Sequence, residues 1–397
     1  MTKTVYVDNA ATTAMSDIAV EAMQPYLQGI YGNPSSLHSI GQRAKEELEN
    51  ARSVVADCLG ALPREIYFTS GGSEADNQAI RSAAYTGAFR GKKHIISTNF
   101  EHHAVLHTLN KLESEGFEVT YLPVDSNGLI TARQVEEAIR PDTALVTVMY
   151  ANNEVGTILP VREIGAVCRS KKVTFHTDAV QAVGHIPVDV EADNIDMLSL
   201  SAHKFHGPKG IGVLYCRKNI PLKSFIEGGA QESGKRAGTE NLAAICSMAA
   251  ALKDAVDHLD ENMTKEKAMR DILISGLSAI PHSKLNGDAT QRLPGNVNMC
   301  FEGIEGESLL LLLDAKGICA SSGSACTSGS LDPSHVLLAL GLPHEVAHGS
   351  LRLSLSPYNT EEEMNYIVGE VPKVVEYLRS ISPVWDELEK GEKPHLI

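Results

Sequence analysis

The sequence predicts an α/β protein with a large, mainly parallel sheet followed by a smaller α/β domain. The chain has 397 residues, which is enough for two domains at roughly 100–200 residues each. Short apolar runs rich in β-formers alternate with helical patterns from about residue 65 to residue 215. This alternation is typical of parallel sheets that are covered by helices. A second and smaller set of alternating elements follows residue 280.

Seven apolar runs are expected to form the strands of the large sheet. They read IYFTS (66–70), HIIST (94–98), VTYL (119–122), LVTVMYA (145–151), TFHTDA (174–179), MLSLSA (197–202) and IGVLYC (211–216). Helices are predicted between the first several runs, at Glu74–Tyr85, Ala104–Glu115, Ala132–Arg140 and Arg162–Ser170. Only eight residues join the last two runs. That is too few for a parallel crossover, so one strand should be antiparallel.

The second half of the chain predicts a boundary between the two domains near residue 258. Few helix breakers occur from 240 to 280, so we expect one long helical stretch there. The large domain should cover 16–258 and the small domain 259–397, joined by an N-terminal arm of residues 1–15. The elements expected in the small domain are strands at 296–301 and 350–355 and helices at Glu307–Ala315, Pro333–Leu340 and from Thr360. The charged residues from Glu387 to the C-terminus predict a loose tail.

Composition excludes several classes of protein. The formal net charge is −15, so the chain has no electrostatic reason to bind nucleic-acid phosphates. The longest apolar run, Leu309–Leu313, is far short of the about 20 residues that span a bilayer. The seven cysteines are irregularly spaced and form no C-x-x-C motif. Together with the lack of a secretory pattern at the N-terminus, this predicts a soluble cytoplasmic protein in a reducing compartment, without an intrinsic metal site.

Lys204 is the first candidate for chemistry. It stands in LSLSAHKFHGPKG, just after a predicted strand. Ligands of open α/β sheets bind beyond the carboxyl ends of the strands. A lysine that is desolvated there can lose its proton and form an imine with an aldehyde. The plainer alternative is an exposed loop lysine, and Lys209 competes with Lys204 on local context alone.

Asp178 stands at the end of another predicted strand, in the segment FHTDAVQ, and Gln181 follows three residues later. By itself, Asp178 is best interpreted as the cap of the next helix. Beside Lys204 it has a second interpretation, because a pyridine-type cofactor needs an anion at its ring nitrogen to act as an electron sink. Gln181 is placed to reach the ring hydroxyl of such a cofactor from the same side of the turn.

A glycine-rich turn leads from a predicted strand into a helix in SGGSEADNQAI (70–80). Glycines with a hydroxyl at a helix N-terminus predict an anion site, built from N–H groups and the helix dipole. The spacing matches neither the GxGxxG fingerprint nor the P-loop. The alternative is that Ser73 and Asp76 form only a helix-capping arrangement.

His102 and Arg352 are further candidates for a ligand site. His102, in NFEHHAVL, also stands at the end of a predicted strand, where it could stack on a planar cofactor and pass protons near neutral pH. A structural or exposed histidine is the alternative. Arg352 alternates with leucines in SLRLSLS, so it should point away from the leucine face of its strand. It is either a surface arginine or a bidentate clamp for a substrate carboxylate.

Cys326 differs from the other six cysteines in its surroundings. It stands in ASSGSACTSGSLDPSH (320–335), which consists almost entirely of small polar residues and glycine. This composition is typical of a mobile loop, about 320–334. The other six cysteines have the surroundings of buried, structural thiols. A mobile loop suits a thiol that has to travel, so the sequence predicts a functional thiol at Cys326.

The order and spacing of these motifs resemble the NifS/IscS-type cysteine desulfurases. These are fold-type I, pyridoxal-phosphate (PLP) enzymes of the class V aminotransferase family. The segments that carry the resemblance cover almost the whole chain: YVDNAATT (6–13), YGNPSSLHSIG (31–41), SGGSEADN (70–77), EHHAV (101–105), ANNEVGTI (151–158), HTDAVQ (176–181), SAHKFHGPKGIG (201–212), RAGTEN (236–241), SSGSACTSGSL (321–331) and LRLSL (351–355).

The resemblance implies a reaction and a role for each candidate. L-cysteine would be converted to L-alanine, and its sulfur would pass to Cys326 as a persulfide. Lys204 would bind PLP covalently, while Asp178 would pair with the ring nitrogen and Gln181 with the phenolic oxygen. His102 would stack on the ring and take part in proton transfer. The phosphate would be held by Gly72, Ser73, Ser201 and His203, and by Thr239 from the partner subunit. The substrate carboxylate would be bound by Asn153 and Arg352. Asn153 would also contact the cofactor. Many relatives carry Ala-Thr-Glu where this chain has Gly72-Ser73-Glu74, and the serine keeps the hydroxyl.

The resemblance also implies partners. A homodimer is expected, and an iron–sulfur scaffold protein would accept the sulfur, with Cys326 as a transient iron–sulfur ligand beside it. Two rival hypotheses stay open. One is another enzyme of the same fold, an aminotransferase or a selenocysteine lyase. The other is a non-catalytic sulfur-handling or regulatory module that kept the fold but cannot bind the cofactor.

Overall fold

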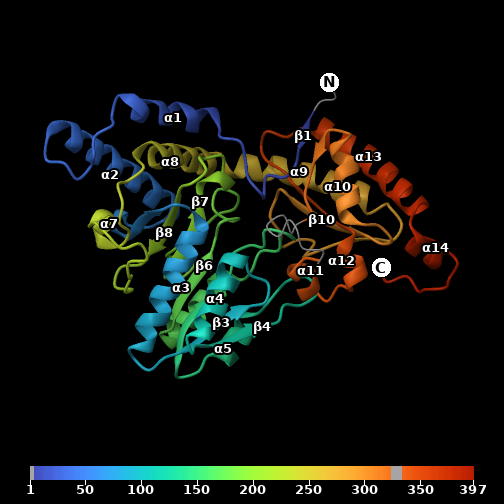
Figure 1. Ribbon diagram of the computed structural model, residues 1–397, viewed down its shortest axis with the longest axis horizontal. Coiled ribbons are helices and arrows are strands. Elements are labelled where there is room, and N and C mark those ends of the chain that lie inside the picture. Colours follow the sequence, from blue (N-terminus) through green and yellow to red (C-terminus); the bar gives the residue numbers. More distant parts are fainter. Residues whose placement is uncertain (1–3, 323–332) are drawn as a thin grey trace.

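The computed structural model describes residues 4–322 and 333–397. Residues 1–3 and 323–332, which include Cys326, lie outside the described residues. The described chain forms one seven-stranded sheet, one three-stranded sheet and one two-stranded pair. Figure 1 shows the large sheet and its helices in blue to yellow, beside a second group of elements, mostly in orange and red, that also contains the N-terminal strand.

The large sheet is mainly parallel, as predicted. In spatial order its strands are β2 (Ile66–Thr69), β8 (Gly212–Cys216), β7 (Met197–Ser201), β6 (Thr174–Asp178), β5 (Thr143–Thr147), β3 (His94–Thr98) and β4 (Glu118–Leu122). Only β8 is antiparallel to its neighbours. The seven predicted runs and the predicted single antiparallel strand are therefore confirmed. The carboxyl ends of the six other strands meet at one edge of the sheet.

Helices cover both faces of this sheet, which explains why its strands are almost continuously apolar. One face packs against α3 (Gly72–Ala88) and α4 (His103–Ser114). The opposite face packs against α2 (Ser39–Leu59), α5 (Ala132–Ala138), α6 (Val161–Lys171) and α8 (Leu242–Asp257). Alternation within β8 serves both faces: Val213 and Tyr215 lie in one core, whereas Leu214 lies in the other. Two further helices, α1 (Asp17–Gln28), which packs on α8, and α7 (Gln231–Gly234), complete this part of the chain.

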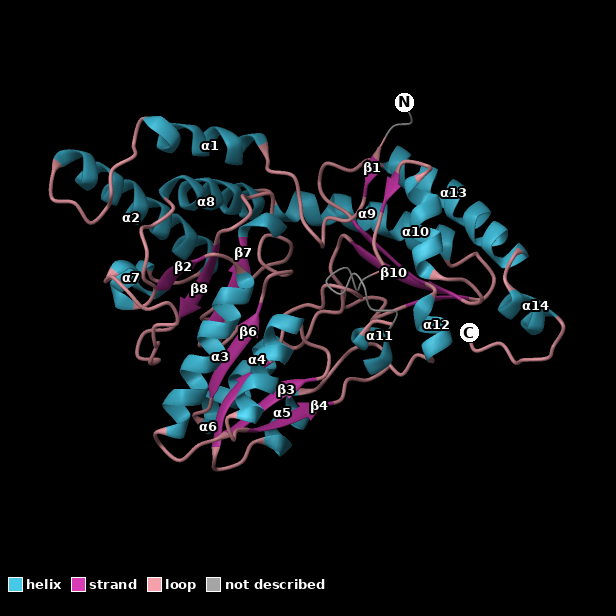
Figure 2. Cartoon of the chain, viewed as in Figure 1, coloured by secondary structure: helices cyan, strands magenta, loops and turns pink. Residues whose placement is uncertain are grey.

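A second core lies around the three-stranded sheet. Its antiparallel strands are β12 (Ser350–Ser354), β10 (Asn296–Phe301) and β9 (Ser283–Leu285), and its helices are α9 (Leu259–Leu277), α10 (Gly306–Asp314) and α13 (Glu361–Ser380). The N-terminal strand β1 (Val5–Tyr6) pairs in parallel with β11 (Ile318–Cys319) and contributes to this core. Three short helices follow the undescribed segment, namely α11 (His335–Ala339), α12 (His344–His348) and α14 (Pro383–Glu389) (Figure 2). No helix among the described residues is long and apolar enough to cross a membrane.

The single long helix predicted from 240 to 280 is wrong. Two helices occupy the region, and they are separated by His258, whose φ of −107° and ψ of 16° are not helical. The break lies where the packing partners change, because Leu252 of α8 belongs to the core of the large sheet and Leu273 of α9 to the second core. The domain boundary near residue 258 itself stays a prediction.

The predicted loose tail is also wrong. Residues 383–389 form α14, and the guanidinium carbon of Arg379 lies 3.9 Å from the ring centroid of Trp385. Farther along, the backbone N–H of Leu396 donates to Oε1 of Glu302 at 2.6 Å. The charge and proline content of the tail predict a loose segment, because they carry no information about its hydrogen bond to the buried carboxylate of Glu302.

Candidate active site

The candidate residues stand at the carboxyl edge of the large sheet. Asp178 is the last residue of β6, and Lys204 ends a short 3-10 turn that directly follows β7. His102 caps the N-terminus of α4, after β3, and accepts a hydrogen bond from the N–H of Ala104 on Nδ1. Gly71 precedes α3, after β2. Topology therefore brings together residues that are up to 133 positions apart in the sequence (71 to 204).

These residues line a cavity of about 390 Å³. The predicted site residues in its wall are Gly72, Ser73, His102, Asn153, Asp178, Gln181, Ser201, His203, Lys204 and Arg352. Thr239 is exposed and is not part of this wall. Cys326 lies outside the described residues. The wall also contains Asp76 and Ala10, which sequence reasoning did not select.

Lys204 is held by the N-terminal arm. Its Nζ donates to the carbonyl oxygens of Ala10 at 2.6 Å and Ala11 at 2.8 Å. Lys209 is exposed, lies outside the cavity wall, and has its Nζ 3.4 Å from the carbonyl oxygen of Thr13. The two lysines, equivalent on local sequence context, are therefore distinguished by position.

Asp178 is a buried carboxylate that faces the cavity. Burial raises its pKa to about 6, against the hydrogen bond from the N–H of Val180 and the positive charge of Lys204, which both lower it. Asp76 lies beside it and is buried as well. Burial, followed by the negative charge of Asp178, raises the pKa of Asp76 well above its usual range. Asp76 is therefore the harder of the two carboxyls to ionise, which favours Asp178 as the one that balances a cation in the cavity.

Both cavity histidines are neutral at physiological pH. Burial, and then the charges of Lys204 and His103, lower the pKa of His102 to about 4. Burial, and then the charges of Lys204 and Lys209, likewise lower the pKa of His203 to about 4. A neutral imidazole at His102 can stack on an aromatic ring without carrying a charge into the cavity, and it can accept a proton there.

The N-terminus of α3 forms an open anion cradle. Its N-cap is Gly71, with φ of 152° and no side-chain cap, so the capping arrangement of Ser73 with Asp76 is wrong. A Cβ on Gly72 would lie 2.6 Å from Cγ2 of Val180, so a larger residue at this position requires the Val180 side chain to shift. The free N–H groups and the positive end of the helix dipole favour an anion beside Ser73 and His203.

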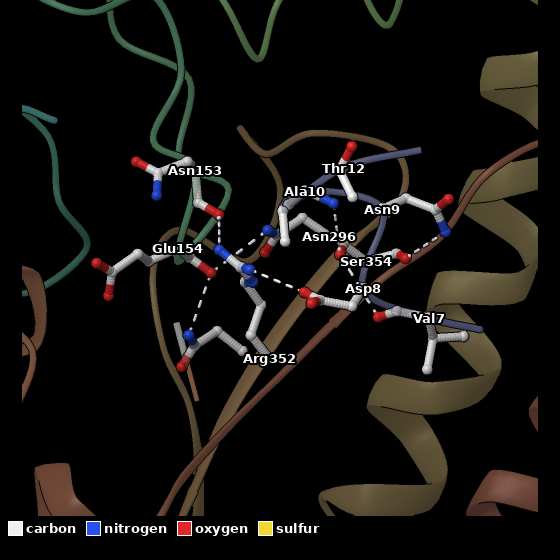
Figure 3. Close-up of polar contacts among 12 residues, drawn as sticks. Val7, Asp8, Asn9, Ala10, Thr12, Asn153, Glu154, Asn296, Arg352 and Ser354 are labelled. Carbon is white, nitrogen blue, oxygen red and sulfur yellow. Dashed lines mark hydrogen bonds and ion pairs between the residues drawn. The ribbon is translucent and has the colours of Figure 1, made fainter. Parts of the chain in front are cut away.

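Arg352 is buried, so the surface alternative is wrong. Its side chain is 2 % exposed, and its guanidinium donates to Oδ1 of Asp8 at 2.9 Å and to the carbonyl oxygen of Asn153 at 3.0 Å (Figure 3). Its Nε is buried and has no hydrogen-bond partner among the described residues. A buried donor of this kind costs free energy unless a ligand accepts from it. The arginine is thus positioned to bind a carboxylate from the cavity.

Sequence reasoning missed the contribution of the arm. Besides the two carbonyls that hold Lys204, Asn9 donates through Nδ2 to the carbonyl oxygen of Ser354, and Gln181 donates to that of Ala10. The arm therefore connects the Arg352 strand with the lysine turn. The available signal was the segment YVDNAATT, whose polar residues have no place in an ordinary strand.

The cysteines of the described part have raised pKa values, which disfavours their thiolate forms at neutral pH. Burial raises the pKa of Cys168 and Cys216 to about 12, and that of Cys58, Cys246 and Cys300 to about 11. Burial and the negative charge of Asp314 also raise the pKa of Cys319. The expectation that all six are buried is wrong for Cys58 and Cys319, which are half-buried. Thiolate chemistry near this site would have to come from Cys326.

Comparison with known proteins places this geometry in a family. Residues 5–367 match the family "Aminotransferase class-V". A cysteine desulfurase IscS of Methanosarcina thermophila is 53 % identical over 382 residues, which cover 96 % of this chain and 94 % of that protein. A solved structure described as a NifS-like protein superposes with a TM-score of 0.89 at 40 % identity, covering 95 % of this chain and all of the other. A structure of SspA in complex with cysteine has a TM-score of 0.77 at 39 % identity, covering 89 % and 99 %. With its cavity lysine, aspartate and arginine in place, the chain belongs to the class-V aminotransferase family.

Proposed function

We propose that this protein is a PLP-dependent cysteine desulfurase, which converts L-cysteine to L-alanine and takes up the sulfur on Cys326. The observation that carries the proposal is the convergence of Lys204, Asp178 and Arg352 on one cavity at the carboxyl edge of the sheet. Relatives that share half of this sequence over nearly its full length bear the name cysteine desulfurase. Because the pKa values of the six described thiols are raised, Cys326 is the remaining candidate for the acceptor of the sulfur.

The cavity residues fit PLP. The uncapped N-terminus of α3, with Gly72, Ser73, Ser201 and His203, would hold the phosphate. Asp178 would meet the ring nitrogen, Gln181 the phenolic oxygen, Asn153 the edge of the group and His102 the ring face. Lys204 would hold it covalently. When bound, PLP withdraws electrons from the carbon that carries the amino group of the substrate.

The chain's own groups bind the substrate and move its protons. The unpartnered Nε of Arg352 would donate to the carboxylate of L-cysteine, beside Asn153. Lys204, released from the cofactor, would take the proton from Cα, with its Nζ guided by the carbonyl oxygens of Ala10 and Ala11. Because His102 is neutral in the cavity, it can accept a proton nearby.

The sulfur-transfer step uses Cys326. Its thiolate would attack the sulfur of L-cysteine, so that an S–S bond forms and the C–S bond breaks with its electron pair on carbon, which then takes up a proton. The products are L-alanine and a persulfide, and no external oxidant is required. The residues that flank segment 323–332 support this role. Ser321 exchanges backbone hydrogen bonds with Arg352, and His335 donates to the carbonyl oxygen of Glu101, next to His102. Both flanks of the segment are thus attached beside the cavity.

The partners follow from the same proposal. In a homodimer, the exposed Thr239 of one subunit would reach the phosphate in the other. The persulfide would be passed to a scaffold protein for iron–sulfur cluster assembly, in the reducing cytoplasm where thiols stay reduced. The large part 16–258 would carry the cofactor, and the part 259–397 would carry Arg352 and Cys326.

The test of the proposed function is the fate of the sulfur and of the amino group. The purified holoenzyme is incubated with L-cysteine and a thiol reductant, with and without a 2-oxo acid, and alanine and sulfide are measured. We expect equal amounts of both, independent of the 2-oxo acid. Transfer of the amino group to the 2-oxo acid without sulfide would identify an aminotransferase. Turnover of L-selenocysteine only would identify a lyase, and failure to bind PLP would identify a non-catalytic module.

Replacing Arg352 with lysine should impair substrate binding. Lysine keeps the charge opposite Asp8 but loses the planar fork that reaches a carboxylate. We expect the KM for L-cysteine to rise about 10- to 100-fold, because hydrogen bonds between charged groups are each worth about 1.5–3 kcal/mol, with a smaller change in kcat. Steady-state kinetics measure this effect, and thermal unfolding of the same preparation checks the fold. An unchanged KM in a folded variant would exclude Arg352 as the carboxylate ligand.

A further inference from the structure

Two histidines and a buried glutamate meet on the far side of the second core. His282 precedes β9, Glu302 follows β10, and His395 belongs to the C-terminal tail. One candidate ligand atom from each lies within 4.8 Å of the others, and no other group of three or more His, Cys, Asp or Glu in the described parts of the chain does this. The three residues are separated by 20 and 93 positions (282 to 302 and 302 to 395). The sequence therefore contains no recognisable ligand spacing.

The glutamate already has the orientation of a ligand. Its side chain is only 5 % exposed, whereas those of His282 and His395 are 33 % and 32 % exposed. Oε2 of Glu302 lies 2.7 Å from Nδ1 of His395 and 3.6 Å from Nδ1 of His282. Oε1 accepts from the N–H of Leu396, which fixes the carboxylate with Oε2 toward both rings.

We propose that His282, Glu302 and His395 form a binding site for a divalent transition-metal ion, of which Zn²⁺ is the best match. Two imidazoles and one carboxylate, with water as the fourth ligand, are a common zinc set. Bonds of about 2.0–2.1 Å in a tetrahedron place the ligand atoms about 3.3 Å apart, between the two distances to Oε2 given above.

Coordination requires only a local change. The rings of His282 and His395 stack at 3.6 Å with an angle of 16° between them, and an ion has to lie near the plane of each ligating ring. The exposed His395 ring therefore has to turn out of the stack, which its position on the tail permits. Nδ1 of His282 lies 2.9 Å from the carbonyl oxygen of Ile397, and coordination through this atom replaces that contact as well. Arg379 donates to the carbonyl oxygens of Glu302 at 3.0 Å and of His282 at 3.0 Å, and so holds both backbone segments. The bound ion would attach the tail to the second core.

The chain contains a built-in reporter for this site. Trp385 is the single tryptophan of the sequence, and its ring centroid lies 5.5 Å from that of His282 and 5.6 Å from that of His395. Cobalt(II) prefers similar ligands to zinc and quenches tryptophan fluorescence at short range. Another group of neighbouring histidines, His102, His103, His107 and His335, lies beside α4 and α11 near the cavity. Metal bound there would not be reported by close contact with Trp385.

The experiment titrates untagged, chelator-treated holoenzyme with Co²⁺ while tryptophan fluorescence is recorded, and then adds Zn²⁺. We expect saturable quenching at one Co²⁺ ion per chain. Added Zn²⁺ should reverse the quenching, because it displaces Co²⁺ from the site. The variant His395→Ala removes one ligand from an exposed position and should weaken Co²⁺ binding about tenfold or more. The matched control His258→Ala removes an exposed histidine whose ring Nδ1 contacts the carbonyl oxygen of Asp254, and it should titrate like the wild type.

Two results would overturn the proposal. One is the absence of saturable quenching in the wild type. The other is an identical titration of His395→Ala and the wild type, which would show that the ion binds elsewhere. Retained circular dichroism of both variants confirms that the comparison is made between folded proteins. Neither outcome depends on desulfurase activity, because the three ligands lie outside the cavity wall.

Discussion

The variant Cys326→Ala should lose alanine formation from L-cysteine by about 10³-fold or more, as expected when the single nucleophile of a reaction is removed. The loss follows because the described thiols have pKa values raised by burial and cannot supply a thiolate in its place. The variant should still bind PLP and stay yellow, since no residue of the cofactor site is changed. Alanine formation and the absorbance of the bound cofactor are measured on the same sample.

Cys319→Ala is the matched control for this experiment. Cys319 is a partly exposed cysteine that precedes the segment containing Cys326, and its side chain contacts Asp314 rather than the cavity. It should retain normal activity. Mass spectrometry after incubation with L-cysteine should find one added sulfur on Cys326 in the wild type and in Cys319→Ala. Normal turnover by Cys326→Ala, or persulfide on another cysteine, would show that the assignment is wrong.

Lys204→Ala should have the second large effect. Reduction with borohydride fixes a lysine–PLP link irreversibly, and this product should be absent from the variant. Turnover should fall about 10³-fold or more, because the group that would hold the cofactor and move the Cα proton is lost. Peptide mapping of the reduced wild-type enzyme identifies the modified lysine, and alanine formation measures activity.

Lys209→Ala provides the control on a lysine five positions away. Its Nζ contacts the arm at Thr13, outside the cavity wall. The borohydride product and the activity should both survive this substitution. If borohydride reduction modified Lys209 in the wild type, or if the lysine–PLP product still formed in Lys204→Ala, Lys209 and not Lys204 would be the lysine that binds PLP. Lys204 and Lys209 both contact the arm, and each substitution removes one positive charge. A difference between the two variants therefore reports the position of the lysine and not its charge.

The types and order of the main elements were predictable, because they depend on local periodicity. Apolar runs bounded by turns marked all seven strands of the large sheet, and the eight-residue connection marked the antiparallel one. The candidate residues Lys204, Asp178 and His102 were found because each stands at or just after the end of a strand, and the carboxyl ends of parallel strands meet. The break at His258 was not predictable, since both helices continue the same local pattern and only their partners differ.

The sequence by itself determined the fold class, the candidate catalytic residues and, through the order of its motifs, the family that this chain resembles. Only the tertiary structure decided which of these residues share a cavity, because contacts between distant segments depend on topology and not on spacing. The arm brings Asp8 to Arg352 and the carbonyls of Ala10 and Ala11 to Lys204. Burial then sets the pKa of Asp178 and His102. The same reason explains why the histidines and the glutamate of the tail site were invisible in the sequence.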